Sequence, residues 1–183
     1  MKLIDVIYEN GNPTGQQKTK PEIHELGLWH MAAHIWIYNS KGEILLQLRA
    51  RDKDSFPGLL DISVAGHVDS GETPLEAAVR EMKEEIGLSV EPEQLDLINI
   101  RRVSNFIKEI KWQNNEIDYV YLYKFDRNIS DLSMEDNEVE KLELILIDKF
   151  EKDINDPNEL RKYVPHGDYY KMIIEKIREI LRR

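Results

Sequence analysis

One stretch of the sequence decides how the rest is interpreted: Gly66-His67-Val68-Asp69-Ser70-Gly71-Glu72-Thr73-Pro74-Leu75-Glu76-Ala77-Ala78-Val79-Arg80-Glu81-Met82-Lys83-Glu84-Glu85-Ile86-Gly87-Leu88. Its second half predicts a helix over Thr73–Ile86. Thr73 suits the N-cap position, Pro74 suits the first helical position, and Glu76 completes a capping box. Gly87 is the expected end of this helix, because glycine accepts the left-handed conformation that often follows a last turn.

The predicted helix has an apolar face and an acidic face. At about 100° per residue, one arc gathers the apolar residues Leu75, Ala78, Val79, Met82 and Ile86. A neighbouring arc carries Glu81, Glu84 and Glu85, and the small Ala77 in that arc leaves space above the carboxylates. Carboxylates this close repel one another unless a cation binds or water screens them. All-oxygen ligands favour Mg²⁺ or Mn²⁺; the alternative is an ordinary solvated acidic face.

The residue types in this stretch and the spacing between them resemble the Nudix box. Gly66, five residues, Glu72, seven residues and then Arg80-Glu81-Met82-Lys83-Glu84-Glu85-Ile86-Gly87-Leu88 match every defined position of that motif. The resemblance to the Nudix superfamily implies an α/β fold, an α/β/α sandwich around a mixed β-sheet, with the box in a loop–helix–loop. It also implies a metal-dependent hydrolase that cleaves diphosphate linkages.

The resemblance assigns roles to the box residues. Its implied metal ligands are Glu81, Glu84 and Glu85. Glu81, Glu84 and Arg80 are the implied catalytic residues, with Arg80 orienting Glu84 one turn later. Glu81 is the first choice for the general base, because it lies nearest Gly66, and Glu116 is the alternative from a later loop. Glu72 is either a structural partner of Arg80 or a further metal ligand.

Outside the box, the chain resembles the Nudix branch that contains type I isopentenyl-diphosphate isomerase, over roughly Asp5–Phe150. The landmarks are Asn12-Pro13-Thr14-Gly15, the run 30–39 from His30 to Asn39, Lys41-Gly42-Glu43, Arg49 with Phe56-Pro57-Gly58, and Ser63-Val64-Ala65-Gly66-His67. The isomerases hold the substrate diphosphate with an arginine and a lysine, and Arg49 and Lys53 stand at those places. Guanidinium and ammonium groups suit a bidentate anion, although both residues also suit an exposed loop.

The isomerase resemblance also implies a second metal site. His30, His67 and Glu116 match positions of that site, and His24 lies only near the third histidine position. The alternative is a pair of structural histidines held by hydrogen bonds. The isomerases supply a cysteine just before the box glycine and carry a degraded box, whereas Ala65 stands here before a complete one. We therefore predict a hydrolase; an isomerase and a non-catalytic diphosphate-binding module are the alternatives.

The remaining sequence predicts one domain, 1–183, with a core of about 28–150, an N-terminal strand or hairpin and a C-terminal helix. The predicted strands are Leu3–Tyr8, His30–Tyr38, Glu43–Leu48, one within Leu59–Val68, Leu95–Val103, Asp118–Phe125 and Leu142–Ile147. Asp126–Glu143 reads as a solvated acidic loop, from which Glu138 can approach the metal site. An amphipathic helix is expected over Tyr169–Leu181. Glu151–Gly167 and this helix either cover the sheet or form a homodimer contact.

Composition limits the partners and the location. The 183 residues include no cysteine, which excludes disulfides, thiolate zinc sites and a cysteine nucleophile. A formal net charge of -10 disfavours a nucleic acid polymer as partner, but allows a small diphosphate substrate beside a cation. The apolar runs are too short for a membrane span, and the start lacks the apolar stretch of a signal peptide. We expect a cytoplasmic protein.

Overall fold

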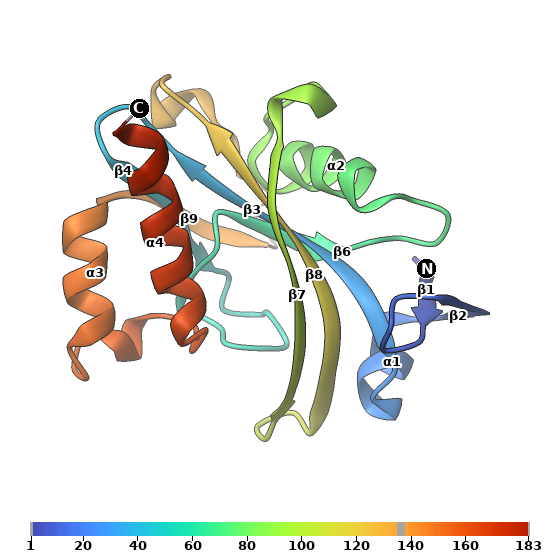
Figure 1. Ribbon diagram of the computed structural model, residues 1–183. Coiled ribbons are helices and arrows are strands. Elements are labelled where there is room, and N and C mark those ends of the chain that lie inside the picture. Colours follow the sequence, from blue (N-terminus) through green and yellow to red (C-terminus); the bar gives the residue numbers. More distant parts are fainter. Residues whose placement is uncertain (1, 135–137, 183) are drawn as a thin grey trace.

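A computed structural model of the protein describes residues 2–134 and 138–182 (Figure 1). Within these residues, one mixed sheet contains nine strands: β1 Ile4–Ile7, β2 Pro13–Lys18, β3 Trp29–Tyr38, β4 Glu43–Arg49, β5 Leu60–Asp61, β6 Val64–His67, β7 Asp96–Ile107, β8 Trp112–Lys124 and β9 Val139–Leu146. The helices are α1 Lys20–Leu26, α2 Pro74–Ile86, α3 Ile147–Asn155 and α4 Asp168–Leu181. No helix in the described part of the chain combines the length and apolarity needed to cross a membrane.

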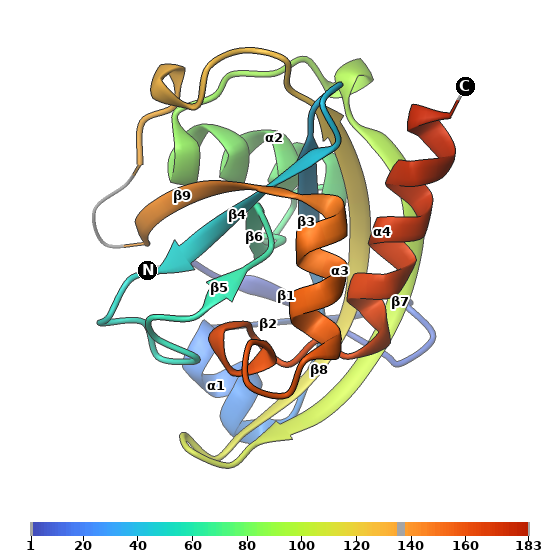
Figure 2. The ribbon, with the colours of Figure 1, turned by 90° about the vertical axis from the view of Figure 1, so that its left-hand side faces the viewer.

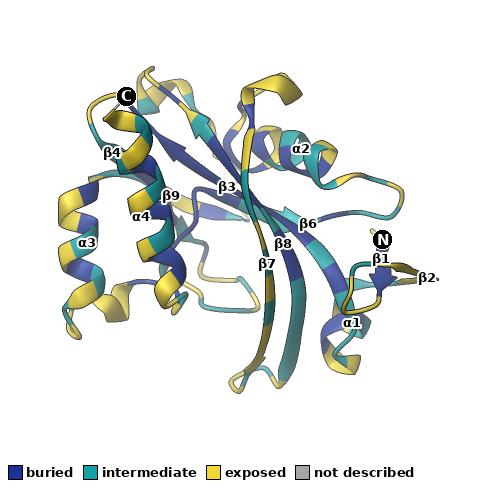
Figure 3. Cartoon of the chain, viewed as in Figure 1, coloured by how far each residue is buried: buried dark blue, intermediate teal, exposed yellow. Residues whose placement is uncertain are grey.

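The central strand β3 separates two hydrophobic cores. Its side chains alternate between faces, so Ile35 and Ile37 join the core under α2, whereas Trp36 and Tyr38 join the core under α3 and α4. Figures 1 and 2 show α2 on one side of the sheet and the two C-terminal helices on the other. The predicted α/β/α sandwich around a mixed sheet is therefore confirmed. The C-terminal region covers the sheet, and Figure 3 shows the buried inner stripes of its helices.

The sheet is mixed because β3 pairs in parallel with β8 and antiparallel with its other neighbours. The predicted strands His30–Tyr38 and Glu43–Leu48 are confirmed as β3 and β4, which pair antiparallel, and the predicted strand Leu3–Tyr8 contains β1. The hairpin of β7 and β8 is longer than predicted and extends to Ile107 and Trp112. Its distal half is rich in Ser, Asn, Gln and Glu, so the sequence there lacks the apolar alternation that marks a strand.

The box helix forms as predicted. The Thr73 hydroxyl accepts a hydrogen bond from the Glu76 backbone N–H, while the Glu76 carboxylate accepts from the Thr73 backbone, and Gly87 ends the helix with φ of 66°. One detail is wrong. Ala77 does not leave space above the carboxylates, because it is fully buried in the core beneath β3. Its small side chain instead allows close packing of the helix on the sheet.

Several elements differ from the sequence-based boundaries. The prediction missed α1 and α3, which are short or largely polar, and gave no bounds for β2, which pairs antiparallel with β1 as the second strand of an N-terminal hairpin. The region Leu59–Val68 contains two strands, β5 and β6. In the acidic segment 126–143, the described residues before 135 form a loop with one 3-10 turn, Ile129–Asp131. The end of the segment belongs to β9, which begins at Val139. Glu135 and Asp136, which belong to that predicted loop, lie outside the described residues.

Candidate active site

A cavity of about 480 Å³ lies where the box helix meets the loop after β4. The box carboxylates Glu81, Glu84 and Glu85 line it from α2. Arg49 and Lys53 line it from β4 and the following loop, so the predicted metal ligands and the predicted diphosphate-binding residues share one cavity. This arrangement places acids that suit a divalent cation beside basic groups that suit an anion.

Arg80 ties the two ends of the box together. Its guanidinium donates to both carboxylate oxygens of Glu72, at 2.8 and 2.9 Å, and to the His67 carbonyl at 2.9 Å. The same group donates to Glu81 at 2.5 Å and to Glu84 at 3.2 Å. The hydrogen bond from Arg80 lowers the pKa of Glu72. This bidentate pair supports the structural role of Glu72 and gives Arg80 an orienting role.

Glu81 and Glu85 are the buried carboxylates of the box. A Cβ atom built on Gly66 would overlap the Glu81 carboxylate, so this box glycine is required for Glu81 to lie against β6. The carboxylate of Glu85, a residue only 4% exposed, accepts hydrogen bonds from the Gln47 side chain and the Ala65 backbone N–H. Burial raises the pKa of Glu81. Burial and the charge of Glu81 raise the pKa of Glu85 to about 8.

The three box glutamates fit a hard divalent cation by chemistry, but they do not converge in this structure. Glu84 turns its carboxylate to Lys2, at 3.0 Å, and to Arg80. Within the described chain, the three carboxylates are not among the groups whose ligand atoms all lie within 4.8 Å of one another. Glu81 and Glu85 each disfavour the ionised form of the other, and a divalent cation bound between them would reverse that effect.

The basic side of the cavity is held by neighbouring acids. The Arg49 guanidinium donates to Asp61 at 2.8 Å and to the Ser55 carbonyl at 3.0 Å. Lys53 forms an ion pair with Glu138, which also lines the cavity, so Glu138 does approach the site as the sequence suggested. Burial lowers the pKa of Lys53 despite the opposing charge of Glu85.

Asp61 connects Arg49 to the C-terminal segment. Its second oxygen contacts His166 Nε2 at 2.7 Å. Burial alone would raise the pKa of Asp61, but the charges and hydrogen bonds of His166, Arg49 and the Ile62 backbone outweigh burial and lower it. The Asp61 carboxylate therefore favours the folded state at pH values above its unfolded pKa, and that contribution is lost as the pH falls toward the lower folded pKa.

We expect Asp61→Asn to lower the free energy of unfolding at pH 7 by about 3 kcal/mol, since it removes the buried carboxylate that pairs with the partly buried Arg49 guanidinium. The difference from the unaltered protein should shrink as the pH falls below about 4, where the unfolded carboxyl is already protonated. Urea unfolding at pH 7 and pH 3 measures both values. The exposed Asp96→Asn is the control, and an equal loss of stability at both pH values would contradict this account of Asp61.

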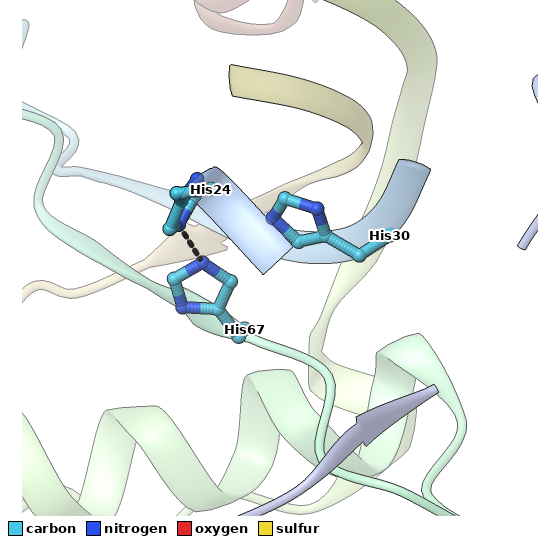
Figure 4. A group of neighbouring side chains, drawn as sticks. All are labelled: His24, His30 and His67. Atoms are coloured by element: carbon cyan, nitrogen blue, oxygen red, sulfur yellow. Dashed lines mark hydrogen bonds between the residues drawn. The ribbon is translucent and has the colours of Figure 1, made fainter. Parts of the chain in front are cut away.

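A second cluster of donors lies beside the box. His24 Nε2 and His67 Nε2 are 3.3 Å apart, and the rings of His30 and His67 stack with centroids at 5.0 Å (Figure 4). A carboxylate oxygen of Glu116 lies 3.2 Å from His30 Nε2 and 3.7 Å from His67 Nε2. Burial and the neighbouring His30 lower the pKa of His24 to about 4, and they also lower that of His67. Neutral imidazoles with a carboxylate are a metal-ligand set.

The structure also shows site residues that the sequence analysis did not assign, and it brings in one that the sequence placed only near the site. His24, expected only near the third histidine position, comes from α1, a helix of seven residues, and completes the histidine cluster. Further charged or titratable residues line the cavity, among them His34, Arg101, Asp118 and His166. Histidine at 30 and 34 and acids at 116 and 118 repeat on one face of two strands that pair in parallel. That period of two was the available signal.

Comparison with known proteins identifies the family. A family model described as the NUDIX domain matches residues 28–167. The chain belongs to the Nudix family. An uncharacterized Nudix hydrolase of Clostridium acetobutylicum is 32% identical over 158 residues, which cover 85% of this chain and 75% of that protein. Nudix hydrolase 3 of Arabidopsis thaliana is 40% identical over 120 residues; this match covers 65% of our Nudix chain but only 16% of that longer protein.

The isomerase branch is also among the relatives of this Nudix protein. The isopentenyl-diphosphate Delta-isomerase of Serratia proteamaculans is 34% identical over 129 residues, which cover 69% of this chain and 68% of that one. Among solved structures, DR0079 of Deinococcus radiodurans matches with a TM-score of 0.68 over 96% of this chain and 98% of that chain, at 22% identity. At this identity, the structural match supports the fold alone.

Proposed function

We propose that the protein hydrolyses a diphosphate linkage in a nucleotide-type or other organic diphosphate. The observation that carries the proposal is the single cavity that holds the complete acidic box on one side and Arg49 with Lys53 on the other. Nudix hydrolases in general act on pyrophosphate bonds, and this cavity provides both the acidic and the basic groups such a reaction requires. The substrate is a small molecule, and we propose a cytoplasmic location without a nucleic acid polymer or membrane as partner; a homodimer stays a prediction.

In this proposal, Glu81, Glu84 and Glu85 hold Mg²⁺ or Mn²⁺. When bound, this ion would neutralise phosphate charge and lower the pKa of the water that attacks the diphosphate. Arg49 and Lys53 bind the diphosphate, and Arg80 keeps Glu81 and Glu84 in place. Glu81 acts as the general base, with Glu116 as the alternative.

Two other functions remain to be compared with hydrolysis. Isomerisation of an isolated alkene needs an acid and a base on opposite sides of the substrate, and the chain contains no cysteine. At the place before the box glycine, Ala65 lines the cavity and cannot transfer a proton. A binding module does not need a cluster of mutually repelling carboxylates. Both considerations support hydrolysis over the alternatives.

A screen of phosphorylated metabolites with Mg²⁺ or Mn²⁺ tests the proposed function. Nucleoside diphosphates and triphosphates, dinucleotides, nucleotide sugars, coenzyme diphosphates and isopentenyl diphosphate form the panel. Release of phosphate or of a nucleotide monophosphate supports hydrolysis. Migration of the double bond in isopentenyl diphosphate would identify an isomerase, and binding without any product would identify a binding module.

We further propose that His24, His30, His67 and Glu116 bind a second divalent metal ion. A set of three imidazoles and one carboxylate suits Zn²⁺ or Mn²⁺ better than Mg²⁺. We expect His24→Gln to lower the affinity for Zn²⁺ at least tenfold while Mg²⁺ binding at the box is unchanged, because His24 lies on α1 and not on the box helix. Competition with a chromogenic zinc chelator measures this affinity. An equal zinc affinity in the variant would support the structural role of these histidines.

A further inference from the structure

The segment 163–167, directly before α4, places in the cavity a histidine that the proposed hydrolysis does not use. Val164 and His166 of this segment line the cavity. The segment is anchored to the rest of the protein on both sides. The Val164 backbone N–H donates to the Leu60 carbonyl at 2.9 Å, and the Val164 carbonyl accepts from the Tyr170 hydroxyl at 2.7 Å. His166 therefore belongs to a firmly held part of the cavity wall.

The His166 ring has one bonded nitrogen and one accessible nitrogen. Its Nε2 contacts Asp61 Oδ1 at 2.7 Å, and the ring lies edge to face against Tyr169 and Tyr170, with centroids 5.7 and 5.3 Å apart. The other nitrogen, Nδ1, has no hydrogen-bond partner among the described residues and is not one of their fully buried atoms. Because the side chain is 22% exposed and lines the cavity, Nδ1 is the nitrogen that a bound molecule can reach.

Asp61 determines which nitrogen of His166 exchanges a proton. Despite burial, its charged and hydrogen-bonded partners hold the pKa of the Asp61 carboxyl below its usual range. At neutral pH this carboxylate is ionised and can only accept hydrogen bonds, so Nε2 of His166 carries a hydrogen. Nδ1 is consequently the atom that gains or loses a proton when the imidazole changes its charge. The pair makes Nδ1 a defined proton-transfer atom.

The same carboxylate places His166 beside the predicted diphosphate-binding residues. Asp61 Oδ2 accepts from the Arg49 guanidinium at 2.8 Å, so Arg49 and His166 contact the two oxygens of one side chain. The box carboxylates line the other side of the cavity. If a diphosphate extends from the box to Arg49, water activated at the box attacks the nearer phosphorus, and the phosphate at Arg49 departs. His166 lies on the side of that departing phosphate.

The departing phosphate needs a proton donor, which the other basic groups on this side do not supply. Breaking the bond leaves negative charge on the bridging oxygen, and a positioned acid lowers the barrier to its departure. Arg49 keeps its proton at every relevant pH. Lys53 is paired with Glu138. An imidazole that changes its charge near neutral pH is suited to the task, and His166 presents one with a free Nδ1.

We propose that His166 is the general acid of the reaction and donates the proton on Nδ1 to the departing phosphate. The inference rests on the proposed function, to which it adds a catalytic residue. The water oxygen forms a bond to the attacked phosphorus, and the bond from that phosphorus to the bridging oxygen breaks. The bridging oxygen keeps the electron pair and takes the proton from Nδ1, while the water gives a proton to Glu81. After the products leave, His166 regains a proton from solvent and Glu81 returns one.

His166→Gln tests the proton transfer. Glutamine keeps a hydrogen-bond donor for Asp61 but is no acid, so kcat with Mg²⁺ should fall at least about a hundredfold while KM changes less than about threefold. The substrate is the diphosphate of the panel that the unaltered protein hydrolyses fastest. Asp168→Asn, whose side chain is 93% exposed, is the control from the same region and should keep both constants. Thermal unfolding checks the fold, and His166→Asn replaces His166→Gln if the latter does not fold.

A chemical probe tests the contact in the unaltered protein without turnover. Diethyl pyrocarbonate acylates accessible, unprotonated imidazole nitrogens, so it should modify His166 in the free protein, as peptide mass spectrometry detects. Imidodiphosphate has a bridging nitrogen that resists hydrolysis. With Ca²⁺ and at ten times its Kd, imidodiphosphate should slow the modification of His166 about tenfold, because it covers Nδ1 in most molecules. Ca²⁺ alone should leave the rate of modification unchanged.

The outcomes separate this inference from the proposed function. Hydrolysis by the unaltered protein with an unchanged kcat in folded His166→Gln, or with a change in KM alone, would overturn the general acid and leave the hydrolase in place. An equal rate of His166 modification with saturating imidodiphosphate would also overturn it, because Nδ1 would then not face the diphosphate. Protection of His166 in a protein that hydrolyses no diphosphate would contradict the hydrolase and, with it, the proton transfer.

Discussion

Glu85→Gln is expected to lower turnover at least about a hundredfold without unfolding the protein. The substitution removes one charged ligand from the proposed metal site, and metal-centred charge stabilisation contributes several kcal/mol to such reactions. The apolar face of α2 is untouched, and glutamine keeps the shape of the side chain between Gln47 and Ala65. Steady-state rates with saturating Mg²⁺ measure the effect. The exposed Glu175→Gln on α4 is the matched control, and an unchanged rate in Glu85→Gln would contradict the assignment of the box.

The same variant is expected to gain stability in the absence of metal, although it loses turnover. The pKa of Glu85 rises from an ordinary 4.5 to about 8 in the folded, metal-free protein. Between these values the folded state binds more protons than the unfolded state, so the stability of the metal-free protein falls as the pH rises. Glu85→Gln removes this contribution. We therefore expect the metal-free variant to be more stable than the parent at pH 8, by about 1–3 kcal/mol, and the advantage to be lost near pH 4.

The box and its helix could be predicted from sequence because their signals are local. The ends of α2 are fixed by residues inside the helix or directly next to it: Thr73, Pro74 and Glu76 at its start and Gly87 at its end. The strand β3 was also predicted, because His30–Tyr38 is a continuous apolar run rich in residues that favour strands. Burial of Glu85 was not visible, because it depends on Gln47 and β6 packing over the helix.

The rest of the cavity depends on contacts between residues that are far apart in the chain. His166 meets Asp61 across 105 positions, and Tyr169 meets His34 across 135. No local pattern encodes such contacts. The distal hairpin of β7 and β8 was missed for a related reason: its polar side chains, Asn105 and Asn114 among them, line the cavity and not an apolar core. Strand prediction relies on apolar alternation, which fails where a strand forms part of a binding site.

Removal of divalent metal is expected to abolish activity and to leave the fold intact. The two main cores are apolar clusters on opposite faces of the sheet, and α2 is held by its caps and by Met82 and Ile86 within one of them. The proposed ligands contribute no apolar packing to either cluster. In excess EDTA, we expect turnover to fall to the uncatalysed background, whereas the far-ultraviolet circular dichroism spectrum remains that of the metal-loaded protein.

The thermal midpoint gives the size of the metal effect. An ion at a hundred times its Kd stabilises the folded state by about 2.7 kcal/mol, so its removal should lower Tm by roughly 5–11 °C in a chain of this size. Return of Mg²⁺ alone should restore both Tm and turnover. The effect of Zn²⁺ on Tm, measured in the unaltered protein and in the His24→Gln variant, gives the corresponding value for the histidine cluster. Turnover that persists in excess EDTA would show that the box works without metal. Loss of the folded spectrum on chelation would instead show that the carboxylates of α2 need a cation in order to pack beside β6. That result would conflict with this structure, in which hydrogen bonds from Gln47 and Arg80 hold those carboxylates.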